Sequence, residues 1–351
     1  MKRFLTVIGM FLIGMLSLSG LIHIAHAIEY PLPPANSRLI GENSTHIVPD
    51  DGRPLESIAA KYQIGLLAML EANPGVDPYL PKPGTELIIP SQMLLPDTPR
   101  QGIIINLAEL RLYYFPEGKN YVVVYPIGIG QLGRNTPIMT TSVSQLIKNP
   151  TWTPTVNIRK DYASRGIILP AVIPAGPDNP MGDFALRLAA GRGEYLIHGT
   201  NANFGIGMRV SSGCIRLRPE DIEDLFRTVP RGTRVQIINE PVKYAIEPDG
   251  KRYVEVHQPL SNKETDDPQT VPIPRSEGLV KFINHRETDE FLVDQVIIRR
   301  SGMPVQVNTG RVANSQVEKA ILKPIEDTAP EIKPAKIPPL HQPGPIYQPD
   351  A

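Results

Sequence analysis

Residues 197–217 read IHGTNANFGIGMRVSSGCIRL, and this stretch carries the strongest signals in the chain for fold and chemistry together. His198 ends an apolar run typical of a buried strand, and Cys214, the single cysteine, follows sixteen residues later in a turn of small residues. Gly213 leaves room for backbone N–H groups to converge on an oxygen that becomes negative when a carbonyl is attacked. The stretch therefore predicts a nucleophile, a base and an oxyanion site within one short segment.

The pairing of one thiol with one nearby imidazole decides how this stretch can react. A thiol becomes a nucleophile when a base takes its proton, and an adjacent imidazole can lower a thiol pKa from about 8.5 to roughly 3.5–7.5. Taken singly, Cys214 is better explained as a small buried residue, and His198 as a hydrogen-bonded structural one. Together they favour catalysis, although their spacing leaves the reaction open.

The charge balance and the cysteine count exclude several classes of protein. The 36 Lys and Arg residues equal the 36 Asp and Glu residues, so the chain has no basic field that would hold a nucleic-acid backbone. A single cysteine closes no intramolecular disulfide and forms no Cys-rich zinc site. With 41% hydrophobic residues among 351, the chain has core material for at least one folded domain.

The first 27 residues have the pattern of an export signal. Lys2 and Arg3 precede an apolar run from Phe4 to Ile22, and Ala25-His26-Ala27 has the small residues that signal peptidase recognises. We therefore predict a signal peptide at residues 1–27. The alternative is an uncleaved anchor, because the apolar run approaches the roughly 20 residues that span a bilayer.

Residues 45–90 form a candidate small unit. A strand-like run at 46–48 is followed by two stretches with helical spacing of apolar residues, at 55–62 and 66–70, and by a second short strand at 87–90. This order predicts a strand, two helices and a returning strand. As an alternative role, the unit is only a spacer or lid for the domain that follows.

Residues 101–240 change to short β-branched and aromatic runs separated by turns. We expect strands at 102–106, 110–115, 121–129, 184–188, 195–198, 233–238 and 253–256. The first three predict a meander, and the last two are expected to close the sheet. Residues 151–180 read as a loop-rich stretch, and residues 219–226 begin with Pro and acids, as helices do. The predicted fold class is therefore mostly β, a barrel or sandwich with few helices.

The end of the chain gives weaker signals. Residues 241–310 are a C-terminal extension in which 278–298 is expected to form a short strand and a helix. Residues 311–351 carry so many prolines that ladders and helices are blocked, and we expect an extended, mobile tail.

The two motifs around His198 and Cys214 resemble the signature of the L,D-transpeptidases of the YkuD family. Similarity extends to PIGIG at 126–130, TWTP at 151–154 and PAGPDNPMG at 174–182. The family usually has His where this chain has Ser212, a departure that we expect to tune the site without disabling it. The resemblance implies a YkuD-type β-sandwich or barrel as the catalytic domain, at residues 101–240.

The small unit at 45–90 resembles a LysM module, an α/β fold that grips the N-acetylglucosamine chains of cell wall. The usual Gly-Asp-Thr-Leu before the first helix is replaced by DGRPL at 51–55, which weakens the expectation of glycan binding more than that of the fold. With this unit in front, the chain resembles the periplasmic enzymes of Gram-negative cell walls.

The family resemblance implies a two-step acyl transfer. Cys214 would attack the carbonyl between meso-diaminopimelate and D-Ala of a peptidoglycan tetrapeptide stem, and the thioester would pass to an amine. His198 would act as base and then as acid, with the Gly199 carbonyl orienting its ring. The N–H groups of Gly213 and Cys214 would hold the oxyanion, and Arg216 would bind a substrate carboxylate or form a structural ion pair. Further substrate-pocket candidates are Ser212, Trp152, Tyr195 and Asn203.

The implied partner is peptidoglycan, the implied compartment is the periplasm, and the chemistry needs neither a metal nor an organic cofactor. The acceptor amine is left open between a C-terminal Lys of an outer-membrane lipoprotein and the diaminopimelate of a second stem. Two other functions also remain open: an L,D-carboxypeptidase or amidase in which water takes the acyl group, and a non-catalytic wall-binding protein. Papain-like peptidases place Cys before His in the chain, which is the reverse of the order found here.

Overall fold

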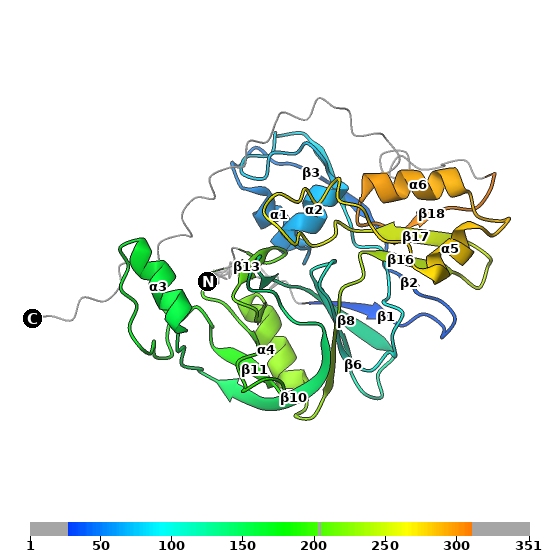
Figure 1. The fold of residues 1–351 in the computed structure, drawn as a ribbon. Helices are drawn as coiled ribbons and strands as arrows, with labels where there is room; N and C mark the ends of the chain where they lie inside the picture. The colour runs from blue at the N-terminus through cyan, green and yellow to red at the C-terminus, as the bar shows by residue number, and fades with distance from the viewer. Residues whose placement is uncertain (1–26, 203–204, 311–351) are drawn as a thin grey trace, which may run out of the picture.

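A nine-stranded sheet, here called the large sheet, forms the body of the computed structural model, which describes residues 27–202 and 205–310. Its strands lie in the order β1 (Ile28–Pro31), β8 (Tyr121–Pro126), β7 (Arg111–Phe115), β6 (Gly102–Asn106), β15 (Arg234–Ile238), β10 (Met139–Lys148), β11 (Phe184–Leu188), β12 (Leu196–His198) and β14 (Ile215–Arg216). The sheet curls around α4 (Pro219–Thr228), whose Ile222 and Leu225 share one hydrophobic core with strands from both halves of the sheet (Figure 1). The prediction of a mostly β fold with few helices is confirmed.

Strand β6 shows why these residues form the centre of the large sheet. Ile103 and Ile105 belong to the core around α4, while Ile104 belongs to a second core on the opposite face, with Met93 and Tyr113. A strand that is buried on both faces reads as a continuous apolar run, as GIIIN at 102–106 does. The antiparallel pairing of β6 with β7 and of β7 with β8 confirms the predicted meander.

Two elements differ from the sequence expectation. The strand β10 has the sequence MTTSVSQLIK, which is too polar to stand out, and it joins β15 to β11. Within the stretch expected to be loop, residues 156–164 form the helix α3 (Val156–Ser164), which projects from the body in Figure 1. Thr155 caps α3 by accepting a hydrogen bond from the Ile158 N–H at 3.3 Å. Ile158 is the buried residue of this helix, so its apolar periodicity is weak.

The LysM-like unit (residues 45–90) has the predicted order of elements. Strands β3 (Ser44–Ile47) and β4 (Glu86–Ile89) pair antiparallel, and helices α1 (Leu55–Lys61) and α2 (Leu66–Ala72) pack on them around Leu55, Met69 and Leu87. A further strand pair, β2 (Leu39–Ile40) with β5 (Met93–Leu94), connects this unit to the large sheet.

The C-terminal unit (residues 241–310) folds separately from the large sheet. Its sheet consists of β16 (Val242–Ile246), β17 (Arg252–Val256) and β18 (Val305–Gln306), and it is covered by α5 (Glu277–Ile283) and α6 (Glu290–Arg299). The expectation that residues 253–256 close the large sheet is therefore wrong, because they pair with β16 and β18 instead. The expectation of a strand in 278–298 is also wrong, since the segment forms two helices.

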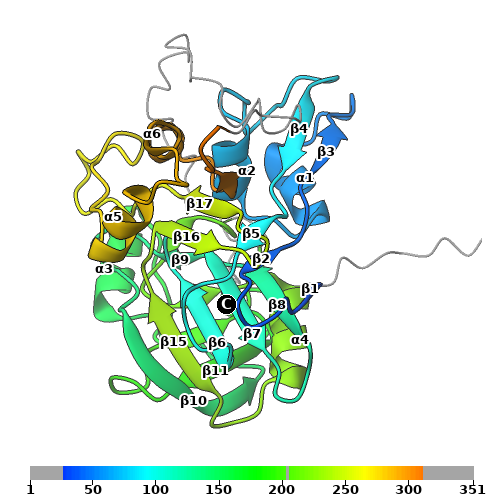
Figure 2. The same ribbon diagram turned by 90° about the vertical axis from the view of Figure 1, so that its right-hand side faces the viewer.

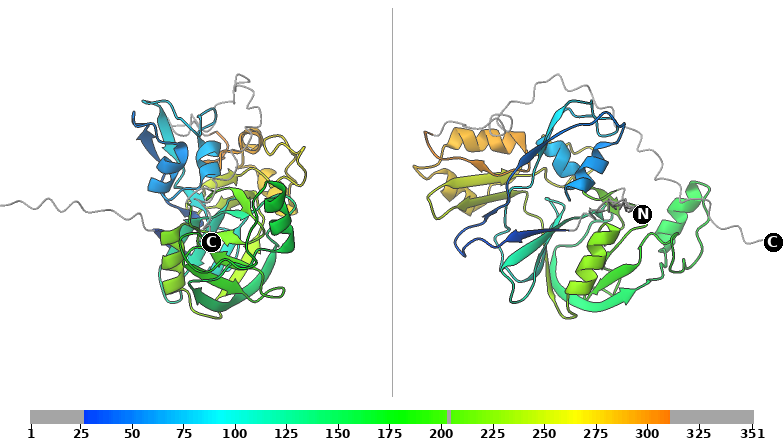
Figure 3. Two further views of the ribbon diagram at one scale, coloured as in Figure 1. Left: turned by 90° about the vertical axis from the view of Figure 1, so that its left-hand side faces the viewer. Right: turned by 180° about the vertical axis from the view of Figure 1, so that it is seen from behind.

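The LysM-like unit and the C-terminal unit lie side by side above the large sheet (Figures 2 and 3). No helix in residues 27–202 and 205–310 is long and apolar enough to cross a membrane. The predicted signal peptide at 1–27, except its last residue, and the predicted mobile tail at 311–351 lie outside the described residues.

Candidate active site

Strands β12 and β14 bring the predicted site residues to one edge of the large sheet. β14 is the last strand, and it pairs in parallel with β12, so that Ile197 opposes Ile215 and His198 opposes Arg216. Arg216 is the direct neighbour of His198 across the strand pair. Cys214 lies in the bend immediately before β14, and the charge of Arg216 acts on both Cys214 and His198.

The Cys214 thiol is half-buried, and its Sγ donates a hydrogen bond to the Glu194 carbonyl at 3.5 Å. Burial raises the pKa of this thiol, and that effect exceeds the lowering by the Leu196 backbone amide and by Arg216. The lowering of the thiol pKa that an adjacent imidazole can cause is therefore not seen here, because desolvation outweighs the nearby positive charge. The thiol holds its proton at neutral pH.

His198 is buried at the end of β12, and its Nδ1 lies 2.6 Å from the Gly199 carbonyl oxygen. Since a carbonyl only accepts, Nδ1 carries the proton, and Nε2 of the neutral ring has a lone pair. Burial and the charge of Arg216 lower the pKa of His198 to about 4, against the opposite effect of the Gly199 and Met181 carbonyls. The ring is therefore a neutral base at physiological pH.

The turn that carries Cys214 is fixed by Ser211. The Ser211 hydroxyl donates to the Cys214 carbonyl and accepts from the Gly213 N–H at 3.2 Å. Gly213 has φ +108°, in the left-handed region that side chains disfavour, which explains a glycine before the cysteine. The Gly213 N–H is thus already engaged with Ser211 in this state.

Arg134 is a site residue that the sequence analysis missed. Its Nη1 donates to the Ser212 hydroxyl at 3.1 Å, beside the Cys214 turn. The loop of Arg134 follows β9 (Ile129–Gly130), which pairs in parallel with β13 (Arg209–Ser211). These segments lie more than 70 residues apart in the chain, and the sequence holds no local signal that they are close in space. The nearby PIGIG motif at 126–130 entered the sequence analysis only as part of the family resemblance.

Arg216 presents a largely buried guanidinium to the same site. Within residues 27–202 and 205–310, no carboxylate lies within 4.0 Å of it, and its buried Nε has no hydrogen-bond partner. Burial lowers the pKa of Arg216, and Tyr162 of α3 and Cys214 act in the opposite direction. The structural ion pair considered for Arg216 is not present among the described residues.

The other substrate-pocket candidates differ in their position relative to the Cys214 turn. Tyr195 flanks the Cys214 turn, since its ring carbon Cε1 lies 4.0 Å from the position that a Cβ on Gly213 would take. Trp152 is further along the chain toward α3, where its backbone exchanges hydrogen bonds with Ile173. Asn203 lies outside the described residues.

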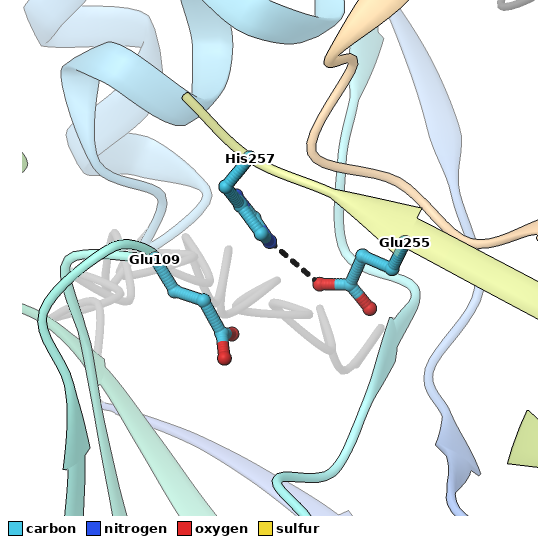
Figure 4. Close-up of side chains that lie close together, drawn as sticks. All are labelled: Glu109, Glu255 and His257. Carbon is cyan, nitrogen blue, oxygen red and sulfur yellow. Dashed lines mark hydrogen bonds and ion pairs between the residues drawn. The ribbon is translucent and has the colours of Figure 1, made fainter. Parts of the chain in front are cut away.

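A second group of polar side chains, here called the junction cluster, lies buried where the three units meet. Its members are Glu71 of α2, Glu109 and Arg111 of the β6–β7 turn and β7, Lys243 of β16, and Glu255 and His257 at the end of β17. His257 Nε2 lies 2.8 Å from Glu255 Oε1 (Figure 4). Its Nδ1 lies 3.2 Å from Glu71 Oε2. Each unit contributes at least one charge.

The junction cluster contains the one group of three potential metal ligands found in the described residues, Glu109, Glu255 and His257. The Lys243 ammonium, however, lies 2.9 Å from both Glu109 Oε2 and Glu255 Oε1. Arg111 also approaches both carboxylates, at 3.2 and 3.3 Å. The cations of the protein thus already occupy the place that a metal ion would take, and the ligand set does not fit a metal.

Family models match most of the described chain in three consecutive segments. A LysM domain matches residues 55–90, the L,D-transpeptidase catalytic domain matches 100–237, and the L,D-transpeptidase C-terminal domain matches 241–307. The last match gives a family to the segment that the sequence analysis treated as an extension.

Curated relatives match over most of their length. The chain is 60% identical over 291 residues to the probable L,D-transpeptidase YcfS of Escherichia coli, covering 82% of this chain and 91% of that protein. It is 56% identical over 292 residues to the probable L,D-transpeptidase ErfK/SrfK of E. coli, covering 82% and 93%. The solution structure of the catalytic domain of an E. faecium L,D-transpeptidase aligns with 39% of this chain and 96% of its own, with 20% identity and a TM-score of 0.28. From the matched domains and the two E. coli relatives, the chain belongs to the L,D-transpeptidase family.

Proposed function

We propose that the protein is a cysteine-dependent L,D-transpeptidase of peptidoglycan in which Cys214 is the nucleophile. The observation that carries the proposal is the parallel pairing of β12 with β14, which gathers a thiol, a neutral imidazole and a guanidinium that forms no ion pair with the described residues at one sheet edge. The thiol would attack the carbonyl between meso-diaminopimelate and D-Ala of a tetrapeptide stem. D-Ala leaves as the thioester forms, and an amine then takes the acyl group.

The proton follows a general-base route. Because both groups are neutral at pH 7, His198 Nε2 takes the thiol proton as the carbon–sulfur bond forms, and gives it to the departing D-Ala nitrogen. The Gly199 carbonyl keeps the ring in the required tautomer. The thiol first turns from the Glu194 carbonyl toward the ring, which exposes the sulfur to the substrate.

The negative oxygen of the tetrahedral intermediate is stabilised by the N–H groups of Cys214 and Gly213. For Gly213 this requires that the substrate oxygen replace the Ser211 hydroxyl as the acceptor. Arg216 binds a carboxylate of the donor stem, because a largely buried guanidinium that has no anionic partner among the described residues gains most from one. Ser212, Trp152, Tyr195 and Asn203 form the walls of the substrate pocket.

The compartment and the partners follow from the same family. The protein is exported by the signal peptide at 1–27 and acts in the periplasm, where the LysM-like unit holds it on peptidoglycan. The acceptor is a lipoprotein Lys or the diaminopimelate amine of a second stem. Mass spectrometry of muropeptides from cells with and without the enzyme distinguishes the two, since each acceptor gives a product of different mass.

The test of the chemistry is intact-protein mass spectrometry after treatment with a carbapenem, which acylates a thiol that has oxyanion donors. Wild type should gain one adduct, on Cys214, and should transfer a soluble tetrapeptide. Cys214→Ala should lose both, and His198→Ala should slow both by roughly 100-fold or more. An adduct or turnover in Cys214→Ala would refute the assignment of the nucleophile.

A further inference from the structure

The LysM-like unit contacts the segment that carries Cys214 at both of its ends. Where the segment begins, the Leu66 N–H donates to the Ile206 carbonyl at 3.4 Å, and the Leu67 N–H donates to the Gly207 carbonyl at 3.2 Å. Where it ends, Arg218 extends into the turn between α1 and α2. Residues 63–67, which end this turn and begin α2 and are here called the clamp turn, therefore hold both ends of residues 206–218.

The first contact is made by backbone on backbone. Gly207 has φ +78°, and a Cβ on it would lie 2.3 Å from the Leu66 nitrogen and 2.4 Å from the Gly65 Cα. A Cβ on Gly65 would in turn lie 2.9 Å from the Gly207 Cα. Two glycines at the crossing allow a contact that any side chain would prevent. The backbone at the start of the Cys214 segment, at Gly207, thus packs directly against the backbone of the clamp turn at Gly65 and Leu66.

The second contact supplies two hydrogen bonds to a fully buried guanidinium. Arg218 is 1% exposed, and its Nη1 donates to Gln63 Oε1 at 3.0 Å and its Nη2 to the Ile64 carbonyl at 2.9 Å. Its Nε has no partner among the described residues. Asp221, the nearest carboxylate, is 3.9 Å away, which is outside hydrogen-bond distance. Every hydrogen bond to this guanidinium within residues 27–202 and 205–310 therefore comes from the LysM-like unit.

The placement of Arg218 connects these bonds to the reacting groups. Arg216 lies two residues earlier on β14, and Cys214 four residues earlier. A strand end that carries an unsatisfied buried guanidinium would shift until water or another acceptor reached the charge. Such a shift would move the strand that pairs with His198.

We propose that Arg218 is a positioning residue through which the LysM-like unit sets the geometry of the Cys214 strand, so that this unit takes part in the transfer step as well as in wall attachment. The inference rests on the proposed function, because it concerns the same transfer. It goes against the reading of residues 45–90 as only a spacer or lid. A shift of about 1 Å at a reacting group can cost roughly 100-fold in rate.

The test uses the full mature chain and a soluble tetrapeptide that serves as donor and acceptor, so that wall binding plays no part. Arg218→Met should lower kcat by about 10- to 100-fold, with KM within about 2-fold of wild type. Gln63→Gly should act in the same direction, and it should fold, because Gln63 has φ +54°, where glycine is favoured. Pelleting with sacculi should be unchanged for both variants.

The matched control is Arg252→Met in the C-terminal unit. Arg252 is also buried, and it donates to Thr288 and to the Phe282 carbonyl, all within that unit. This variant should lose stability without losing kcat when assayed well below its unfolding temperature. Rescue is a second readout: Arg218→Lys should lower kcat, and adding Gln63→Glu should restore part of it by giving the ammonium an anionic acceptor.

The outcomes separate this inference from the proposed function. The positioning role is wrong if Arg218→Met folds and keeps the wild-type kcat. If Arg218→Met does not fold, the same conclusion follows from a wild-type kcat in Gln63→Gly. In either case the proposed function stands, because the wild-type enzyme still transfers. The role is also wrong if kcat falls equally in Arg252→Met at matched stability. If wild type itself forms no adduct at Cys214, the proposed function fails instead.

Discussion

Removing the charge of His257 gives the sharpest test of the junction cluster. Burial alone would lower the pKa of His257, but its hydrogen bonds to Glu255 and Glu71 raise it to about 9. With His257 protonated, the cluster has three carboxylates and three cations, Lys243 and Arg111 being the others. Loss of that proton leaves one uncompensated negative charge in the protein interior.

The size of the effect follows from the two pKa values. A rise from 6.5 to about 9 corresponds to about 3 kcal/mol of folding free energy. Because the folded pKa is raised, this stabilisation is fully present below pH 6.5, and it is lost as the pH rises through 9. His257→Gln cannot bind the proton, so it should be about 3 kcal/mol less stable than wild type at pH 6 and nearly equal to it at pH 10.

The assay is urea unfolding of wild type and His257→Gln at pH values from 6 to 10. Burial raises the pKa of Asp221 to about 8, which also lowers stability as the pH rises, but this contribution is common to both proteins and cancels in the difference. His46→Gln is the matched control, because burial lowers the pKa of His46 and its effect has the opposite sign. Parallel stability curves for wild type and His257→Gln would refute the assignment of a protonated His257.

Three further outcomes are expected. The rate of Cys214 alkylation by iodoacetamide should keep rising through pH 9, because burial raises the thiol pKa; a plateau near pH 7 would contradict it. Ser212→His should retain transfer with a changed rate and an adduct still on Cys214, whereas activity that appears only in the variant would mark the native chain as non-catalytic. Gly207→Ala should lower the free energy of unfolding in urea by about 3 kcal/mol, because its methyl group meets the Leu66 nitrogen. Gly118→Ala is the control, since Gly118 has φ +71° and open space around it, and this variant should lose about 1 kcal/mol. Equal losses in the two variants would contradict the close contact at Gly207.

Strong local patterns in the sequence predicted the elements that depend on one face or one turn. The GIIIN run of β6, the Pro and acids that begin α4, and the two short helices of the LysM-like unit all appear where they were expected. In β10, by contrast, Thr, Ser and Gln stand where apolar residues would mark a strand, since much of that strand is only half-buried. Tertiary pairing with β11 and β15 decides its conformation.

The candidate site was predictable in its residues but not in its electrostatics. The short spacing in sequence predicted that His198 lies near Cys214. The strand register, which the sequence does not reveal, places Arg216 opposite His198, where its charge lowers the pKa of the imidazole. The burial that raises the thiol pKa depends on the packed structure. Arg134 reaches Ser212 from 78 residues away, a distance over which the sequence holds no pairing signal.

The junction cluster also limits how this chain can exchange parts with its relatives. A recombination that replaced only the LysM-like unit with one lacking Glu71 would leave His257 with one carboxylate fewer, at a site that water does not reach. Exchange of the C-terminal unit for one that lacks a lysine at position 243 would leave Glu109 without this ammonium group. Chimeras should therefore retain their stability when the residues of the cluster are inherited together, and the three units are best treated as one heritable block when hybrids are built.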